Sequence, residues 1–407
     1  MRINIDRFKK CMDQINDIST TLEGGVNRLA LTDEDLKARE LLKFWIKEEG
    51  MEFRFDDAGN MYGRLEGLDP GQAPVCVGSH LDTQPNGGKY DGTLGVLAGL
   101  EVIRTIKENN IKTKRPIELI NWTNEEGARF KPPVTGSGLV AEFFDTEWVH
   151  NLRDENGIKF KDELVRIGYL GDRKNRLNNA NSYLEMHIEQ GPVLENLGYS
   201  TGLVTGILGI KWLDVIIYGM ADHAGPSPMT FRRDALMTAA NSIVKMREHV
   251  LSYGDPVVVT VGQISAFPGT TNIIPGMVKF TVDLRHYSDE GLKKLEKEVT
   301  EIINGVCKQE GTSSEINIMW SNPPTFFNEN VLKIIEEAMN EAALPIFRIN
   351  SGAGHDANYI SEIAPTGMLF VRSIGGKSHC PEEYSRLEDI EQAIQVLLKS
   401  VIKLSET

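Results

Sequence analysis

The spacing of apolar positions predicts alternating strands and helices in the first part of the chain. Residues 74–77 and 117–122 are short apolar runs of the kind that form buried strands, whereas 36–49 and 95–107 carry apolar side chains near helical spacing. A strand, a helix and another strand in succession are typical of a mainly parallel sheet. We therefore expect a mixed α/β fold here.

The pattern changes between residues 207 and 320, where strand-like segments are separated by two longer helical ones. The expected strands are 212–218, 257–261, 278–284 and 316–320, and the expected helices are 233–249 and 290–309. A helix at 331–343, a strand at 368–371 and a final helix at 387–404 follow. We expect an inserted α+β domain at 207–320 and a discontinuous first domain made of residues 1–206 and 321–407.

The length and net charge of the chain limit the classes of protein to which it can belong. A chain of 407 residues, 41% of them apolar, is long for one hydrophobic core, which supports two domains. The net charge of -14 argues against general binding to nucleic acids or anionic membranes. No apolar run reaches the roughly 18 residues of a spanning helix, and the N-terminus lacks the apolar stretch of a secretory signal. We expect a soluble, cytoplasmic protein whose scattered cysteines are reduced thiols: Cys11, Cys76, Cys307 and Cys380.

The first chemical signal is the segment GSHLDTQPNGGKYDGTLG. His80 and Asp82 follow an expected strand at alternate positions and would share a face in extended backbone. A metal-bound imidazole needs an acceptor for its other nitrogen, and open α/β sheets place such sites beyond the carboxyl ends of their strands. Asp91 comes after a glycine turn at the start of the next helix, where a carboxylate can bridge two cations. This segment therefore predicts part of a metal site.

The second signal is NWTNEEGARF, in which two carboxylates end a strand-like segment. The adjacent side chains of Glu125 and Glu126 point in different directions. One carboxylate can then bind metal while the other faces the attacking water as general base. A solvated acidic turn is the structural alternative.

Two further segments carry histidines beside glycine turns. In SYLEMHIEQGPVLE, apolar residues alternate with polar ones as in a half-buried strand, which contains His187 and is followed by Gln190. His379 follows a strand and a glycine turn in GGKSHCPEEYS. Nitrogen and oxygen ligands without an evident thiolate fit zinc, manganese, cobalt or nickel, and the sequence does not choose among these metals.

The inserted region holds three polar residues that are candidates for substrate contacts: His223 in ADHAGPSPM, Asn272 in PGTTNIIPG and Arg285 in TVDLRH. A guanidinium is a natural bidentate partner for a substrate carboxylate. A solvated arginine and a packed or capping histidine are the structural alternatives.

The chain resembles the M20 metallopeptidase family, and within it the branch of N-carbamoyl-L-amino acid hydrolases, allantoate amidohydrolases and beta-ureidopropionases. The resemblance runs through almost the whole chain. It rests on segments that occur in the order found in the family: GSHLDTQPNGGKYDG, TNEEGARF, HIEQGP, ADHAGPSPM, PGTTNIIPG, DLRH and SGAGHDA. It implies a di-metal catalytic domain with an inserted ferredoxin-like domain that acts as lid and as dimer interface.

The resemblance also implies roles for individual residues. His80, Asp91 and His187 would hold one metal ion, and Asp91, Glu126 and His379 the other, so that two divalent ions per subunit share Asp91. Asp82 would orient His80, and Glu125 would take a proton from the attacking water and pass it to the departing nitrogen. His223 would stabilise the oxyanion, in this family often in the active site of the partner subunit. The implied substrate contacts are His223, Gln190, Asn272, Arg285 and backbone near Gly354.

The chain departs from the commonest family wording at a few positions. Gln84 stands where a small apolar residue is usual, and Pro226-Ser227 replaces paired threonines. Cys380 follows His379 where a polar residue is common, which places a thiol next to an expected ligand. His187, where many M20 peptidases have aspartate, supports the carbamoylase branch.

The reaction expected from the resemblance is release of ammonia and carbon dioxide from an N-carbamoyl-L-amino acid. Allantoate amidohydrolase would use the same metals, and beta-ureidopropionase acts on a substrate that differs by one methylene, worth only about 1 to 3 kcal/mol in a pocket. A peptidase or aminoacylase is a further alternative. A non-catalytic homodimer that binds an amino-acid derivative is the alternative from another class, but every expected ligand and the base are present.

Overall fold

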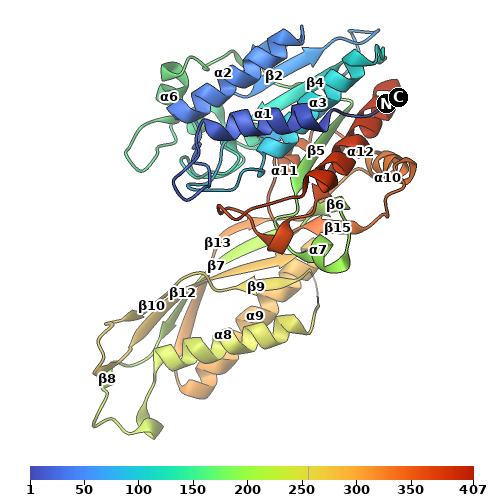
Figure 1. Ribbon diagram of the computed structural model, residues 1–407. Coiled ribbons are helices and arrows are strands. Elements are labelled where there is room, and N and C mark those ends of the chain that lie inside the picture. The colour runs from blue at the N-terminus through green and yellow to red at the C-terminus, as the bar shows by residue number, and fades with distance from the viewer. Residues whose placement is uncertain (255) are drawn as a thin grey trace. The chain divides into compact units, whose positions relative to one another are not determined.

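The computed structural model describes residues 1–254 and 256–407, which form two compact units (Figure 1). The first unit consists of Met1–Thr205 and Phe326–Thr407, and the second of Gly206–Thr325. Within the described ranges, no helix is both long enough and apolar enough to cross a membrane.

A nine-stranded sheet forms the centre of the first unit. Its strand order is β1-β2-β4-β3-β5-β16-β6-β14, and β15 pairs with β6. The pairs β4-β3, β3-β5 and β5-β16 are parallel, whereas β1-β2, β2-β4 and β16-β6 are antiparallel. The bounds are Glu52–Phe55 (β1), Met61–Leu65 (β2), Val75–His80 (β3), Ile117–Trp122 (β4), Ser182–Ile188 (β5), Thr201–Ile207 (β6), Thr325–Phe326 (β14), Arg348–Ser351 (β15) and Thr366–Val371 (β16). The prediction of a mixed fold with a mainly parallel central sheet is confirmed.

Helices of the first unit pack against this sheet and against one another. The longer ones are α1 (Ile5–Asp17), α2 (Asp33–Glu48), α3 (Thr93–Glu108), α10 (Glu329–Glu341) and α12 (Leu387–Glu406). The shorter ones are α4 (Thr135–Val140), α5 (Thr146–His150), α6 (Phe160–Arg166), α7 (Val193–Leu197) and α11 (Ala357–Ile360). Helix α3 is buried along most of its length, and a Cβ on its Gly99 would meet Leu119 and Val77. A side chain at that position would therefore push the helix off the sheet.

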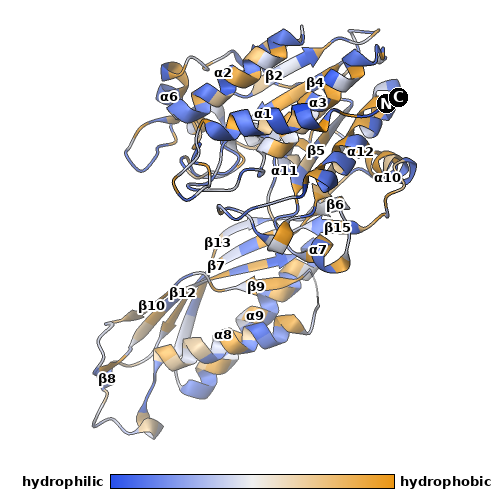
Figure 2. Ribbon diagram, viewed as in Figure 1, coloured by the Kyte–Doolittle hydropathy of each residue, from blue (hydrophilic) through white to orange (hydrophobic). Residues whose placement is uncertain are grey.

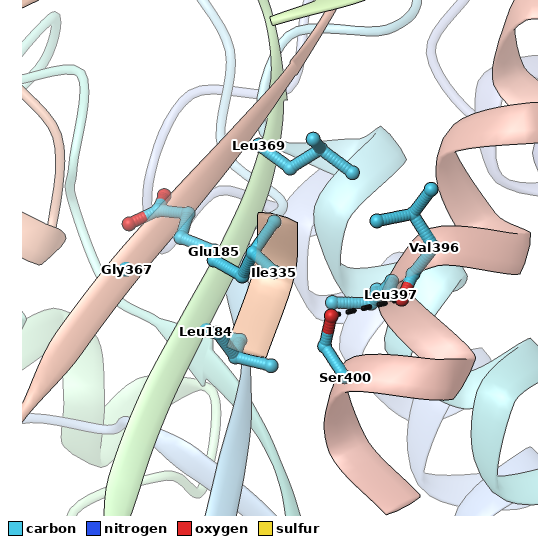
Figure 3. A pocket seen from close by; sticks show the side chains of 8 residues that line it. All are labelled: Leu184, Glu185, Ile335, Gly367, Leu369, Val396, Leu397 and Ser400. Atoms are coloured by element: carbon cyan, nitrogen blue, oxygen red, sulfur yellow. Dashed lines mark hydrogen bonds between the residues drawn. The ribbon is translucent and has the colours of Figure 1, made fainter. Parts of the chain in front are cut away.

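Strand β5 is buried on both faces, which corrects the expectation of a half-buried strand. All of its residues are buried because it lies between β3 and β16 at the centre of the sheet. Leu184 points toward α12, while the Glu185 carboxylate lies on the opposite side of the strand (Figure 3). The alternation of polar and apolar residues therefore separates a hydrophobic face from a buried polar face, not from solvent.

The second unit is a five-stranded antiparallel sheet with two helices on one face. The strand order is β10-β12-β7-β13, β9 pairs with β12, and β8 and β11 form a separate two-stranded ribbon. The strands are β7 (Gly209–Tyr218), β8 (Asp222–His223), β9 (Val258–Thr260), β10 (Ile264–Phe267), β11 (Ile273–Ile274), β12 (Met277–His286) and β13 (Ser313–Asn322). Helices α8 (Ala235–Leu251) and α9 (Asp289–Glu310) cover the apolar face, and Figure 2 shows hydrophobic residues along them.

A small cavity of about 10 Å³ lies among β5, β16, α10 and α12 (Figure 3). Leu184, Leu369, Ile335 and Leu397 are among its lining residues. The hydroxyl of Ser400, also in the lining, donates to the carbonyl of Val396 at 2.9 Å, so it is satisfied within α12. A space of this size holds at most one water molecule, and we treat the cavity as a packing gap in the core.

Replacing Leu184 with alanine should enlarge this gap and destabilise the first unit by about 2–5 kcal/mol, because the closely packed walls relax only in part. Chemical denaturation of Leu184→Ala beside the wild type measures the change. Val165→Ala, at a position 59% exposed on α6, serves as control and should shift stability by no more than about 0.5 kcal/mol. Equal stability of the two variants would mean that Leu184 is not part of a tightly packed core.

Candidate metal centre

The potential metal ligands gather at the carboxyl edge of the parallel strands. His80 is the last residue of β3, and His187 is the next-to-last residue of β5. Asp91 lies just before α3, while Glu125 and Glu126 follow β4. His379 follows β16 and a short 3-10 turn. Parallel strands bring their carboxyl ends to one edge of the sheet, which explains how residues so distant in sequence meet.

The first donor group consists of His80, Asp91 and His187, all of them buried. Asp91 Oδ1 lies 3.5 Å from His80 Nε2 and 3.2 Å from His187 Nε2. The potential ligand atoms of this group all lie within 4.8 Å of one another.

The second donor group consists of Asp91, Glu126 and His379. His379 Nε2 lies 3.3 Å from Asp91 Oδ2 and 3.5 Å from Glu126 Oε2. The two groups therefore share Asp91 but use different oxygens of its carboxylate. This is the arrangement of a carboxylate that bridges two cations.

The hydrogen bonds of the two buried histidines fix which ring nitrogen can bind metal. His80 Nδ1 lies 2.9 Å from the carbonyl of Asp82, and His187 Nδ1 lies 3.0 Å from the carbonyl of Ile188. Because a carbonyl only accepts, each Nδ1 carries a hydrogen. In the neutral rings, Nε2 then presents a lone pair toward the Asp91 carboxylate. The Gly92 N–H donates to His187 Nε2 at 3.2 Å, as expected for an acceptor nitrogen.

His80 Nε2 is a buried polar atom without a hydrogen-bond partner among the described residues. Its neighbours Asp91 Oδ1 and Glu125 Oε2, at 3.5 and 3.4 Å, are also acceptors. Acceptors facing one another inside a protein need a positive charge between them. The donor set of imidazole nitrogens and carboxylate oxygens suits a divalent transition metal, so these residues fit a metal ion.

The crowding of carboxylates around Asp91 raises the pKa of two of them. Burial, with the charge of Asp91 as the next cause, raises the pKa of Glu126 to about 7. The same two causes raise the pKa of Glu383 to about 7. Carboxylates packed this closely repel one another, and a bound cation relieves that repulsion.

Asp82 acts on the acidic turn more than on the His80 ring. Its carboxylate lies 3.9 Å from His80 Nδ1, and the ring is held by the main-chain carbonyl of Asp82 instead. The carboxylate accepts the backbone N–H groups of Glu125 and Glu126, each at 3.2 Å. The family resemblance implies that the Asp82 side chain orients the imidazole, whereas in the structure the main-chain carbonyl of Asp82 holds the ring.

The turns that follow the ligand-bearing strands use left-handed backbone. Asn124, Gln190 and His379 have φ values of 58°, 60° and 56°, and Gly92, which follows Asp91, has 62°. A Cβ on Gly92 would lie 2.2 Å from His80 Cε1, so only glycine allows the ring and the loop to approach. Non-glycine residues adopt this conformation at an energetic cost, and such strain concentrates at functional sites.

Three polar side chains that the sequence argument did not assign as ligands hold the carboxylates in place. Gln190 Nε2 donates to Asp91 Oδ2 at 2.7 Å, Ser378 Oγ donates to the same oxygen at 2.9 Å, and Gln84 Nε2 donates to Glu126 Oε2 at 2.8 Å. Gln190 was expected to bind substrate, and the structure places it on a candidate ligand.

Glu383 is a buried residue of the site that the sequence argument missed. Its carboxylate accepts the N–H groups of Tyr90 and Asp91, at 2.8 and 3.1 Å, and lies 3.0 Å from the hydroxyl oxygen of Ser378. Its only sequence signal is its place in GGKSHCPEEYS, four residues after His379, where nothing distinguishes it from the neighbouring Glu382.

The remaining predicted site residues lie apart from these donor groups in the chain. Gly354 follows β15, and a Cβ there would lie 3.8 Å from Asn358 Oδ1. His223 pairs with Ile273 in the β8-β11 ribbon, beside Asn272, and Arg285 lies on β12 with its guanidinium bonded to Asp283. His223, Asn272 and Arg285 belong to the second unit, and their roles remain predictions.

Comparison with known proteins identifies the family. Residues 76–403 match the model of Peptidase family M20/M25/M40. The chain belongs to this family. It is 37% identical to the N-carbamoyl-L-amino-acid amidohydrolase of Rhizobium meliloti, over 100% of this chain and 97% of that protein. It is 34% identical to the allantoate amidohydrolase of Bacillus subtilis (strain 168), over 94% and 93% of the two chains.

A solved structure similar to this one comes from Burkholderia multivorans and is described as an amidase of the hydantoinase/carbamoylase family. It has a TM-score of 0.96 and 37% identity, and the similarity covers 99% of this chain and 98% of that one. The M20 assignment made from the sequence motifs is thus confirmed, and both donor groups lie within the matched residues.

For this M20 chain we expect divalent cations to stabilise the fold, and Asp91→Asn to lose that response because Asp91 belongs to both donor groups. Chelated protein would be titrated with Mn²⁺ or Co²⁺ while bound metal and the melting temperature are measured. The exposed Asp13→Asn on α1 is the control and should behave as wild type. Retention of two equivalents by Asp91→Asn would contradict the shared carboxylate.

Proposed function

We propose that the protein is a metal-dependent amidohydrolase that converts N-carbamoyl-L-amino acids to L-amino acids, ammonia and carbon dioxide. The observation that carries the proposal is the pair of donor groups joined by Asp91, with the Glu125 carboxylate beside them. The named activities of the similar proteins support the choice of an amidohydrolase over a peptidase.

The donor groups would hold two divalent cations of the zinc, manganese, cobalt or nickel type. His80, Asp91 and His187 would bind one, and Asp91, Glu126 and His379 the other. When bound, such cations polarise a carbonyl and make water acidic enough to act as nucleophile near neutral pH. The protein supplies the positions and the proton transfers.

Glu125 is suited to move the proton. Its carboxylate is buried beside His80 but is not part of either donor group. Burial raises the pKa of its carboxyl well above the usual range for glutamate. It would take a proton from the attacking water and pass it to the departing nitrogen, so no covalent intermediate with the enzyme is needed. The bonds from Asp82 to the Glu125 and Glu126 N–H groups hold the turn during both transfers.

Allantoate amidohydrolase is the alternative within the same chemistry. Allantoate and N-carbamoyl-amino acids both carry a ureido group and a carboxylate, so the metal groups and Glu125 would serve either reaction. The similarity to relatives of both names leaves substrate choice to contacts outside the donor groups.

To test the proposal, the manganese-loaded protein would be incubated separately with N-carbamoyl-L-methionine, its D-enantiomer, allantoate and beta-ureidopropionate, with ammonia release as the readout. We expect turnover of the L-carbamoyl compound. Glu125→Gln should keep its metal and lose about 10²–10⁴-fold in kcat, because a general base contributes about that much. Glu142→Gln, an exposed glutamate, is the control and should keep full activity.

Other outcomes of this assay have distinct meanings. Preference for allantoate would move the substrate assignment while leaving the metal centre intact. Metal binding without hydrolysis of any compound would contradict the amidohydrolase proposal and favour a binding protein.

We also propose that the protein forms a homodimer through its second unit. One face of α8 exposes apolar side chains at positions three, four and seven residues apart: Met237, Ala240, Val244 and Leu251. Exposed apolar side chains aligned on one helix face are typical of an interface.

Replacing Val244 with arginine should therefore shift the protein from dimer to monomer, because a charge in the middle of this stripe would be buried without a partner. Light scattering coupled to size exclusion gives the mass. Lys297→Glu, on the exposed side of α9, is the control for a change of surface charge. A wild-type protein that is monomeric at high micromolar concentration would refute the interface.

A further inference from the structure

Arg28 is a fully buried guanidinium that touches the loops carrying two candidate metal ligands. Its side chain is 0% exposed, and no carboxylate among the described residues forms an ion pair with it. Buried arginines are usually paired with a carboxylate. The bonds that Arg28 makes instead are to main-chain carbonyls and hydroxyls, so its partners need a separate explanation.

The guanidinium joins two loops at once. Nε donates to the carbonyl of Leu81 at 2.6 Å, and Nη2 donates to the hydroxyl of Thr93 at 2.9 Å. Leu81 stands between His80 and Asp82, whereas Thr93 is the first residue of α3 and its N–H donates to the Asp91 carbonyl at 2.6 Å. One rigid planar group thus spans the His80 loop and the Asp91 loop.

Further bonds hold Arg28 itself in place. Its N–H donates to Thr83 Oγ1 at 2.9 Å, and the Thr83 N–H donates to the Arg28 carbonyl at 3.0 Å. Nη1 donates to the carbonyl of Ile15 at 3.2 Å and to Ser19 Oγ at 3.0 Å, at the end of α1. The side chain therefore has a single orientation, fixed from the first helix of the chain.

The loops that Arg28 joins lie beyond the regular hydrogen bonds of the sheet and of α3, so side chains hold them. Strand β3 ends at His80, so the sheet ladder no longer holds residues 81–83. Helix α3 has Gly92 as its N-cap, with no side-chain cap. Burial lowers the pKa of Arg28 to about 10, against the opposing charges of Asp35 and Asp82, so the group remains charged at neutral pH. A charged donor makes stronger bonds to carbonyls than a neutral one.

We propose that Arg28 is a positioning residue that sets the distance between His80 and Asp91, and thereby tunes the affinity of the cation held by His80, Asp91 and His187. The inference rests on the proposed metal centre. Arg28 contacts neither Glu126 nor His379, so the second cation depends on it only through the shared ligand Asp91.

The test measures the affinity of each cation site separately. In a His379→Ala background only the first donor group is complete, and in a His187→Ala background only the second. Chelated proteins of each background would be titrated with Co²⁺, with equilibrium dialysis for affinity and the visible absorption of the bound ion as a report on ligand geometry.

Arg28→Met should weaken Co²⁺ binding about 10- to 100-fold in the His379→Ala background, which is the usual effect of losing a residue that orients metal ligands. Affinity in the His187→Ala background should fall by a clearly smaller factor, because Arg28 acts on that donor group only through Asp91. Arg28→Lys keeps the charge but cannot span both loops, so it should recover only part of the affinity and shift the absorption bands.

A matched control is Arg176→Met. Arg176 is also buried, at 8% exposure, and also bonds to a carbonyl and a hydroxyl, those of Leu139 and Thr146, besides its ion pair with Asp57. Its loss should lower thermal stability without changing Co²⁺ affinity in either background.

A second variant keeps the test decisive if Arg28→Met does not fold. Thr93→Val removes the acceptor of Nη2 with little change of shape and should weaken the first site in the same direction, less than additively when combined with Arg28→Lys. Equal affinities of Arg28 variants and wild type, or equal losses in both backgrounds, would overturn the positioning role. If the unsubstituted chain itself binds no Co²⁺, the metal centre fails, and the inference fails with it.

Discussion

The carboxylate of Asp91 is the group on which the geometry of the site depends. It contacts three imidazoles, and it receives hydrogen bonds from Gln190 and Ser378 on one oxygen. The two oxygens of one carboxylate can serve two cations only if the surrounding donors are fixed on opposite sides, and that separation comes from the parallel strands of a mixed sheet. The sheet therefore brings the ligand-bearing loops to one edge of the first unit.

Keeping so many acidic groups in the interior has a cost that the fold must offset. Burial and mutual repulsion raise the pKa of several of these carboxylates, and the turns at Asn124, Gln190 and His379 adopt left-handed backbone. Each such turn costs on the order of 1 kcal/mol or more. The large hydrophobic core that includes the sheet, α3 and α12 supplies the stability that offsets this cost.

The central sheet and the candidate ligands could be predicted from the sequence because both have local signals. The runs at 74–77 and 117–122 are continuous and apolar, and His80 and His187 stand in or beside such runs. The roles of Glu383 and Arg28 could not be predicted, because neither residue has a periodic or motif-level signal. Both roles come from hydrogen-bond partners that are distant in sequence.

For a related reason, the alternation in β5 led to the wrong prediction of a half-buried strand. Glu185 and His187 are polar, and a polar face usually indicates solvent, but here other buried polar groups cover that same face of the strand. The alternation of polar and apolar residues shows only that the two faces of a strand differ. It does not show what covers each face.

The position of β16 has a consequence for how the protein is made. In the sheet this strand lies between β5 and β6, which are neighbours in sequence, and His379 follows it. A growing chain on the ribosome thus carries β5 and β6 long before the strand that separates them, and must hold a gap in its sheet until the last segment emerges. The long-range pairing delays completion of the fold. A cation that binds to the second donor group before this segment emerges would lack His379.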